Sequence, residues 1–230
     1  MAFNMSLGVT TVTPGIGLSQ VFDFLDNAEE LPRHIVMFYE EPELAMTVAL
    51  RFLKSGLEKG ERCKYDVPNE QGSFADVEHA KAFVEQEMQD NGIDTAYYKR
   101  KGLLQLYSFR DDNIVDLDSY RKSIEKTRST LLKQFGSESR FPRWRRIGRA
   151  ITNIKTDSGM ASELQIENYF QNDAYAKIIS QNGILICTYQ VDDIVSALEK
   201  KEHGINELLQ AHDAAIYLLK NGNGLAIRLR

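Results

Sequence analysis

The chain has 230 residues, a formal net charge of −5, and a composition of 43% hydrophobic and 27% charged side chains. This composition is typical of a folded globular protein, and it argues against intrinsic disorder and against direct nucleic-acid binding through a global positive field. No apolar run approaches the roughly 20 residues of a membrane-spanning helix, and no signal-peptide pattern begins the chain, so we expect a cytoplasmic protein without membrane contact.

The first 30 residues are predicted to form a tail and one short helix. Residues 1–16 contain Pro14 and Gly15, which interrupt regular structure, and we expect a mobile or partner-dependent segment. Residues 18–30, LSQVFDFLDNAEE, place their apolar side chains on one side of an amphipathic helix that ends before Pro32. We expect this helix to contact a partner protein or a second copy of the chain.

Strands and helices alternate through residues 31–230, which we predict to be a single domain. One helix is expected directly after the first strand. Further helical segments are expected at residues 74–92, 117–135, 160–181 and 192–212. The strands are predicted as HIVMFY (34–39), ERCKYDV (61–67), LLQLYSF (103–109), RRIGRAITNI (145–154), GILICTYQ (183–190), AAIYLL (214–219) and LAIRLR (225–230). This alternation predicts an α/β fold of three layers, αβα, with a mostly parallel doubly wound sheet. The Asn-Gly-Asn-Gly sequence at 221–224 adds a C-terminal antiparallel hairpin.

The turn after the first strand is acidic where many α/β proteins have a phosphate-binding loop. It reads Glu40-Glu41-Pro42-Glu43, with no glycine and no lysine. Carboxylates and a proline suit the first turn of a helix, and a cation or polar-ligand site is the alternative interpretation. The chain also lacks dinucleotide-binding, P-loop, nucleophile-elbow and HExxH motifs. We therefore predict no catalytic residue, no metal, no cofactor and no enzymatic activity.

The cysteines and histidines offer weaker indications of a ligand site. Cys63 and Cys187 form no C-x-x-C motif, and each lies two residues before a tyrosine, Tyr65 or Tyr189. This spacing puts sulfur and phenol on one face of a strand. The pairs are either core packing or, where the two strands approach, a pocket for a small and mostly apolar ligand with one polar group. His34 and His212 lie in apolar surroundings, where a hydrogen-bonded core histidine is the usual interpretation.

A short basic stretch precedes the fourth predicted strand. RFPRWRRIGR, residues 140–149, carries five arginines around two aromatic residues. Such a mixture can bind nucleic acid or a phosphate-containing ligand. The alternative is a solvated sheet edge, or arginines that pair with nearby acids.

The order of several motifs resembles the MEDS domain, a methanogen/methylotroph sensory domain named after a dichloromethane-dehalogenase repressor. The motifs that carry the resemblance are His34-x-x-x-Phe38-Tyr39 before the acidic turn, Ser55–Glu61 followed by Cys63, Gly92-Ile93-Asp94, Gly102-Leu103-Leu104, Glu163–Asn168, Leu185–Tyr189 and Ala211-His212-Asp213. This resemblance implies a RecA-like or KaiC-like core without a functional phosphate loop. It also implies a sensor of small molecules such as hydrocarbon derivatives, within signalling or transcription proteins.

Ligands of doubly wound sheets bind beyond the carboxyl ends of the strands. Those ends and the motifs together give the predicted ligand-contacting residues: His34, Tyr39, Glu40, Cys63, Tyr65, Glu167, Cys187, Tyr189 and His212. We expect a non-enzymatic sensory domain with a small-molecule ligand and a signalling or transcription partner, or a homo-oligomer. The alternatives are a nucleotide-binding protein with a divergent site and a structural oligomerisation module.

Overall fold

A computed structural model describes residues 17–27, 33–67, 76–108, 117–148, 183–192, 194–195 and 205–229. Within them lies a seven-stranded sheet of order β3-β2-β4-β5-β1-β6-β7. The strands are β1 (His34–Tyr39), β2 (Arg62–Asp66), β3 (Leu104–Tyr107), β4 (Trp144–Gly148), β5 (Gly183–Gln190), β6 (Ala214–Leu218) and β7 (Gly224–Arg228). Neighbouring strands from β3 to β6 are parallel, and β7 is antiparallel to β6. The mostly parallel sheet and the C-terminal hairpin are thereby confirmed.

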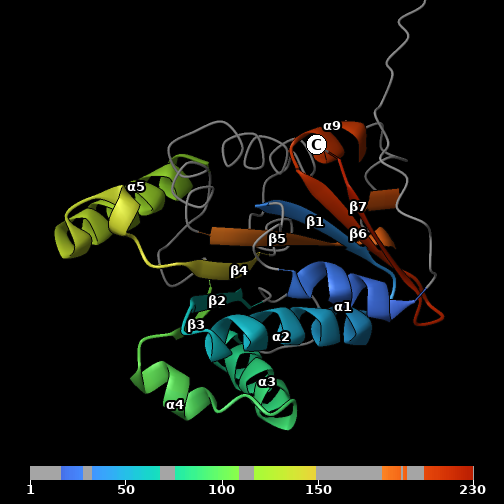
Figure 1. The fold of residues 1–230 in the computed structure, drawn as a ribbon, viewed down its shortest axis with the longest axis horizontal. Helices are drawn as coiled ribbons and strands as arrows, with labels where there is room; N and C mark the ends of the chain where they lie inside the picture. Colours follow the sequence, from blue (N-terminus) through green and yellow to red (C-terminus); the bar gives the residue numbers. More distant parts are fainter. Residues whose placement is uncertain are drawn as a thin grey trace, which may run out of the picture.

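Helices cover both faces of the sheet (Figure 1). One face carries α1 (Leu18–Asp26), α2 (Pro42–Glu58), α3 (Val77–Asp90) and α4 (Thr95–Arg100). The other face carries α5 (Leu117–Phe135) and α9 (Ile205–Gln210), with the 3-10 helix η2 (Glu138–Arg140) after α5. We call them the α2 face and the α5 face, and they confirm the three-layer prediction. The predicted helix at 160–181 and the strand residues 149–154 lie outside the described residues.

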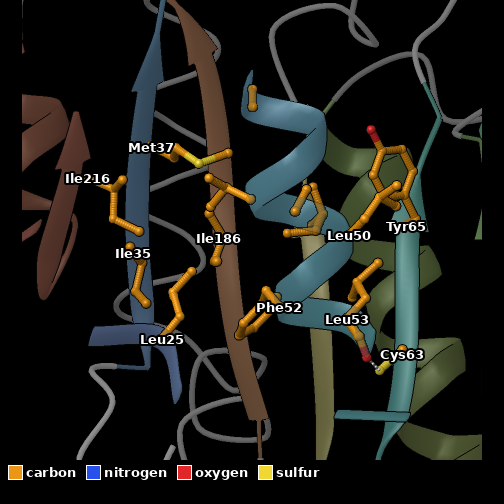
Figure 2. Close-up of a cluster of buried hydrophobic side chains, with 14 of the residues drawn as sticks. Leu25, Ile35, Met37, Leu50, Phe52, Leu53, Cys63, Tyr65, Ile186 and Ile216 are labelled. Atoms are coloured by element: carbon orange, nitrogen blue, oxygen red, sulfur yellow. Dashed lines mark hydrogen bonds between the residues drawn. The ribbon is translucent and has the colours of Figure 1, made fainter. Parts of the chain in front are cut away.

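The α2 face holds the larger apolar core (Figure 2). Helix α2 repeats its apolar side chains at intervals of three and four, so one side of it meets the sheet. Every residue of β1 is buried, as expected for a strand covered on both faces. No helix among the described residues is both long enough and apolar enough to cross a membrane.

Helix α1 packs inside the chain rather than presenting its apolar side to a partner. Val21 is fully buried and Leu25 is nearly so, both within the core of the α2 face. A Cβ atom at Gly224 in β7 would lie 2.6 Å from Cγ2 of Val21, so the hairpin and the helix are in close contact. Val21 and Leu25 are therefore buried within the chain itself, and a partner contact through this helix stays a prediction.

Two consecutive arginines on β4 point to opposite faces and are both buried. On the α2 face, Arg145 donates from Nε to Glu61 Oε2 at 2.6 Å and from Nη1 to the carbonyl oxygen of Phe52 at 2.9 Å. On the α5 face, Arg146 donates from Nε to Asp66 Oδ1 at 3.1 Å. The interpretation of these arginines as a solvated edge is thus wrong, and their interpretation as partners of nearby acids is confirmed.

The path of Arg145 requires a glycine on α2. A Cβ atom at Gly56 would lie 2.6 Å from Cδ and 2.8 Å from Nε of Arg145. Glycine normally weakens a helix interior by roughly 0.5 to 1 kcal/mol relative to alanine. Here it gives the guanidinium room to reach the carbonyl oxygen of Phe52.

We predict that Gly56→Ala lowers the free energy of unfolding by roughly 1 to 3 kcal/mol, because the added methyl group overpacks a buried ion pair. The matched control is Ser55→Ala on the same helix, which should change it by less than about 0.5 kcal/mol. Urea unfolding followed by circular dichroism measures both. Stabilisation by Gly56→Ala, as expected for an unobstructed helix glycine, would contradict the contact.

Candidate functional site

The structure distributes the predicted ligand-contacting residues over both faces of the sheet. Tyr39, Cys63 and Tyr65 belong to the core of the α2 face. Cys187 and Tyr189 belong to the core of the α5 face, and β4 separates their strand from β2. The two cysteine–tyrosine pairs therefore form no common pocket, contrary to one of our two interpretations. Glu167 lies outside the described residues.

Cys63 and Tyr65 are packing residues of the α2 face. The thiol of Cys63 donates to the carbonyl oxygen of Leu53 at 3.4 Å, as drawn in Figure 2. Burial raises the pKa of the Cys63 thiol from 9.0 to about 12, and the nearby Arg145 guanidinium opposes this shift only in part. Tyr65 is fully buried and places its hydroxyl 3.5 Å from Sδ of Met46. A neutral thiol and an enclosed phenol favour the core-packing interpretation here.

The acidic turn joins the start of α2 to the C-terminal hairpin. Oε2 of Glu40 accepts a hydrogen bond from the backbone N–H of Lys220 at 3.1 Å, and the N–H of Glu40 donates to the carbonyl oxygen of Leu218 at 3.3 Å. Pro42 begins the helix after Glu41, which is the N-cap. The turn is thus a helix start with a proline and Glu43 in its first turn, as the helix-start interpretation expects, but Glu41 makes no side-chain capping hydrogen bond and Glu40 contacts the hairpin instead of the helix.

His34, Cys187 and His212 meet on the α5 face, although they are far apart in the sequence. One ligand-forming atom from each, a ring nitrogen or the sulfur, lies within 4.8 Å of the other two. Sγ of Cys187 is 3.4 Å from Nε2 of His34, and the two imidazole centroids are 3.9 Å apart. All three side chains are buried, His212 completely. Three of the predicted residues therefore form one cluster.

Backbone contacts fix the orientation of both imidazole rings. Nδ1 of His34 lies 2.8 Å from the carbonyl oxygen of Ala211, and Nδ1 of His212 lies 2.7 Å from that of Leu208. The backbone of His34 is held as well, because its N–H donates to Asp213 Oδ2 at 3.1 Å and its carbonyl accepts from the Asp213 N–H at 2.7 Å. The start of β1 is thereby joined to the segment that follows α9.

A cavity of about 370 Å³ lies between α5 and strands β3, β2 and β4. Its cationic lining residues are Arg62, Lys64, Arg128 and Arg146, and its aromatic ones are Tyr107, Tyr120, Phe141 and Trp144. No aspartate or glutamate belongs to the described lining. Nζ of Lys64 lies 3.3 Å from the ring centroid of Tyr107, and the guanidinium carbon of Arg62 lies 5.4 Å from that of Phe135. The cavity combines aromatic walls with positive charge.

Sequence reasoning did not place this cavity, although Cys63 is one of its lining residues and the stretch at residues 140–149, with its phosphate-ligand alternative, supplies Phe141, Trp144 and Arg146. Arg62 and Lys64 are two residues apart on β2, and Trp144 and Arg146 are two apart on the neighbouring β4. Residues two apart share one face of a strand, so each pair reaches the same side of the sheet. The pattern was visible, but the adjacency of the two strands was not.

The sheet, its two helical layers and the acidic strand–turn–helix define a doubly wound α/β domain in which carboxylates stand where a phosphate loop would be. The family model of the methanogen/methylotroph, DcmR sensory domain, MEDS, matches residues 33–214. The chain therefore belongs to the MEDS family, and the resemblance noted from its motifs is confirmed.

Among the solved structures that are similar to this chain are two from archaea. A KaiC-like protein from Pyrococcus horikoshii has a TM-score of 0.49 and 16% identity, with 86% of this chain and 79% of that chain covered. The flagellar accessory protein FlaH from Methanocaldococcus jannaschii has a TM-score of 0.47 and 12% identity, with 98% and 88% covered. The search of curated proteins found no match.

We predict that Cys63 resists alkylation in the native protein. With its ordinary pKa of 9.0, the thiol of the unfolded chain is about half reactive thiolate at about pH 9. The native pKa of about 12 leaves Cys63 protonated at that pH. Its labelling by iodoacetamide, followed by peptide mass spectrometry, should be roughly three orders of magnitude slower than in guanidinium.

The raised pKa of Cys63 also makes the free energy of unfolding depend on pH in a definite direction. Because the native state holds this proton and the unfolded state loses it, the contribution of Cys63 to stability is complete below pH 9.0 and declines as pH rises toward about 12. Equal labelling rates for native and unfolded protein would contradict the burial of this thiol.

Proposed function

We propose that this chain is a non-enzymatic sensory domain that binds a small organic anion in the cavity under α5. Binding would change the position of α5, and a signalling or transcription partner would respond to that change. The observation that carries the proposal is a cavity with four cationic side chains, four aromatic side chains and no carboxylate in its described lining. A ligand pocket is expected to combine apolar walls with a few polar groups that fix orientation. Membership of a sensory-domain family supports the same class of function.

The four cations differ in how far their charge is already balanced. Arg146 is paired with Asp66, and Nη2 of Arg128 lies 2.7 Å from Glu138 Oε1. Among the described residues, no carboxylate forms an ion pair with Arg62, which is partly buried on the same face of β2 as Lys64. A carboxylate or phosphate group on a ligand would supply the missing negative charge at Arg62, with its apolar part against the aromatic side chains.

Helix α5 is the element through which binding could reach a partner. It contributes Ser123, Thr127 and Arg128 to the cavity, while other side chains of the same helix are exposed. Arg128 also connects α5 to η2 through Glu138. A ligand that contacts both α5 and β2 would favour one position of the helix, and a position that depends on ligand is the requirement for a sensor.

A nucleotide is the less favoured ligand. In doubly wound sheets, phosphates bind at the first strand–turn–helix, where backbone N–H groups converge on the anion. Here the carboxylate of Glu40 directly follows β1 and accepts from the N–H of Lys220 in the hairpin, and Glu43 occupies the first turn of α2. Their carboxylates oppose a triphosphate by like-charge repulsion.

We predict that benzoate, a small aromatic carboxylate, raises the melting temperature of the protein in a saturable manner, whereas benzyl alcohol, its uncharged counterpart, does not. At ten times its dissociation constant a ligand adds about 1.4 kcal/mol of stability, which is roughly 3 to 6 °C for a chain of this size. Thermal-shift titration measures this, with short-chain carboxylates and inorganic phosphate as further probes.

The matched variants are Arg62→Gln, which removes a cation that has no carboxylate partner among the described residues, and Lys122→Gln, which removes an equal charge from the exposed side of α5. Arg62→Gln should weaken benzoate binding at least about tenfold, and Lys122→Gln should leave it unchanged. Equal stabilisation by benzyl alcohol would contradict the role of charge, and no stabilisation by any probe would contradict the binding site.

We further predict no binding heat for ATP with magnesium at millimolar concentration, because of the carboxylates at the start of α2. Isothermal titration calorimetry is the measurement. A saturable heat that survives Arg62→Gln would place a nucleotide outside the cavity and favour the divergent nucleotide-binding alternative.

A further inference from the structure

We propose that His34, Cys187 and His212 together bind one thiophilic transition-metal ion, with zinc(II) as the best-matched class. The site lies on the α5 face at β1, β5 and the segment after α9, and it shares no residue with the lining of the anion cavity. The proposal therefore does not depend on the proposed ligand.

The spacing of the three ligand atoms is close to that of a tetrahedral zinc site. Zinc–sulfur and zinc–nitrogen bonds of about 2.3 and 2.0 to 2.1 Å place neighbouring ligand atoms about 3.3 to 3.6 Å apart. Sγ of Cys187 and Nε2 of His34 are already 3.4 Å apart, and all three ligand atoms lie within 4.8 Å of one another. Only a small movement of His212 or its neighbours is needed to enclose an ion.

The ring tautomers are those that a metal requires. A carbonyl oxygen can only accept a hydrogen bond, so Nδ1 of His34 must donate to Ala211 and Nδ1 of His212 must donate to Leu208. In the neutral rings this leaves the lone pair on Nε2 of each histidine, and in His34 this is the atom that lies 3.4 Å from Sγ of Cys187. A metal-binding histidine commonly donates its other N–H to a backbone carbonyl in this way, which orients the ring.

The ligand set also selects the kind of metal. One thiolate and two imidazoles suit zinc, copper(I) or iron(II), whereas magnesium and calcium prefer oxygen ligands. Binding would convert the Cys187 thiol to a thiolate and release one proton, so the ligand set would carry one negative charge against the cation. The carboxylate of Asp213, bonded to the backbone N–H of His34, adds a negative charge nearby.

Deep burial favours a structural site over an open reactive one. His34 is 6% exposed, Cys187 is 3% exposed and His212 is 0% exposed. The ion would join the start of β1, the middle of β5 and the segment after α9, which are separate in the sequence. Three protein ligands leave the fourth coordination position to another donor.

The test uses cobalt(II) as a spectroscopic probe on the full-length protein after treatment with a chelator. We expect one equivalent to bind, with visible ligand-field bands and a near-ultraviolet thiolate-to-cobalt charge-transfer band, and we expect zinc to displace it. Cys63→Ser is the matched control because the chain has only two cysteines. The band should persist in Cys63→Ser and disappear in Cys187→Ser, and His212→Gln should weaken cobalt binding at least tenfold.

Circular dichroism of each variant separates loss of the site from loss of the fold. If Cys187→Ser does not fold, the band in Cys63→Ser still assigns the ligand, because Cys187 is then the one remaining thiol. A folded wild-type protein without the charge-transfer band would overturn the proposal and leave a hydrogen-bonded histidine–cysteine core. A band that persists in folded Cys187→Ser would overturn it as well. Arg62→Gln should leave the cobalt spectrum unchanged, which separates this site from the anion cavity.

Discussion

Two buried ion pairs determine how β4 fits into the sheet. Arg145 and Arg146 are consecutive, so a strand must direct them to opposite faces, and each meets a carboxylate beside β2. Glu61 immediately precedes β2 and Asp66 is its last residue, so the pairs hold both ends of that strand. Isolated charges are costly to bury, and loss of one partner of such a pair typically costs about 3 to 5 kcal/mol. A shift of β4 by one residue would exchange the faces and leave both pairs broken.

The same two arginines give the two faces different roles. On the α2 face, Arg145 passes Gly56 to reach the helix backbone and completes an apolar layer that includes Cys63 and Tyr65. On the α5 face, Arg146 contributes to a cavity rather than to close packing. The cavity residues and the histidine–cysteine cluster share this second face. The α2 face is therefore the more closely packed one, while both proposed binding sites lie on the α5 face.

The sequence predicts the elements of this fold well because local patterns determine them. HIVMFY is apolar throughout and becomes a fully buried strand, and the repeat of three and four in α2 becomes its buried side. The Asn-Gly-Asn-Gly sequence becomes the β6–β7 turn. The strand order is not a local property. No periodicity indicates that β4 lies between β2 and β5, so Cys63 and Cys187 could not be assigned to opposite layers beforehand.

The sites depend on this non-local information. His34 and Cys187 are 153 residues apart, and only the parallel pairing of β1 with β5 brings them together. The arginines of β4 show the same limit of prediction from sequence. A run of basic residues looks the same in the sequence whether its side chains are solvated or paired with buried acids. The acidic turn is the opposite case. Its four acidic and proline residues are adjacent in the sequence, so the sequence alone indicates a helix start without a phosphate site. The structure adds that Glu40 accepts a hydrogen bond from the hairpin backbone.

In a doubly wound fold, carboxylates at the first strand–turn–helix make the usual phosphate position unfavourable for an anion, while the arrangement of the strands is unchanged. Any remaining recognition must then use another surface of the sheet. Here the α5 face offers positive charge at β2 and β4 and soft ligand atoms at β1 and β5. Strand β4 pairs with β2 on one side and β5 on the other, so it lies between these two regions. A ligand that moves α5 relative to β4 would act on the strand that the buried arginines hold fixed. In the proposed function, α5 would therefore move relative to β4, which the buried ion pairs of Arg145 and Arg146 hold in place.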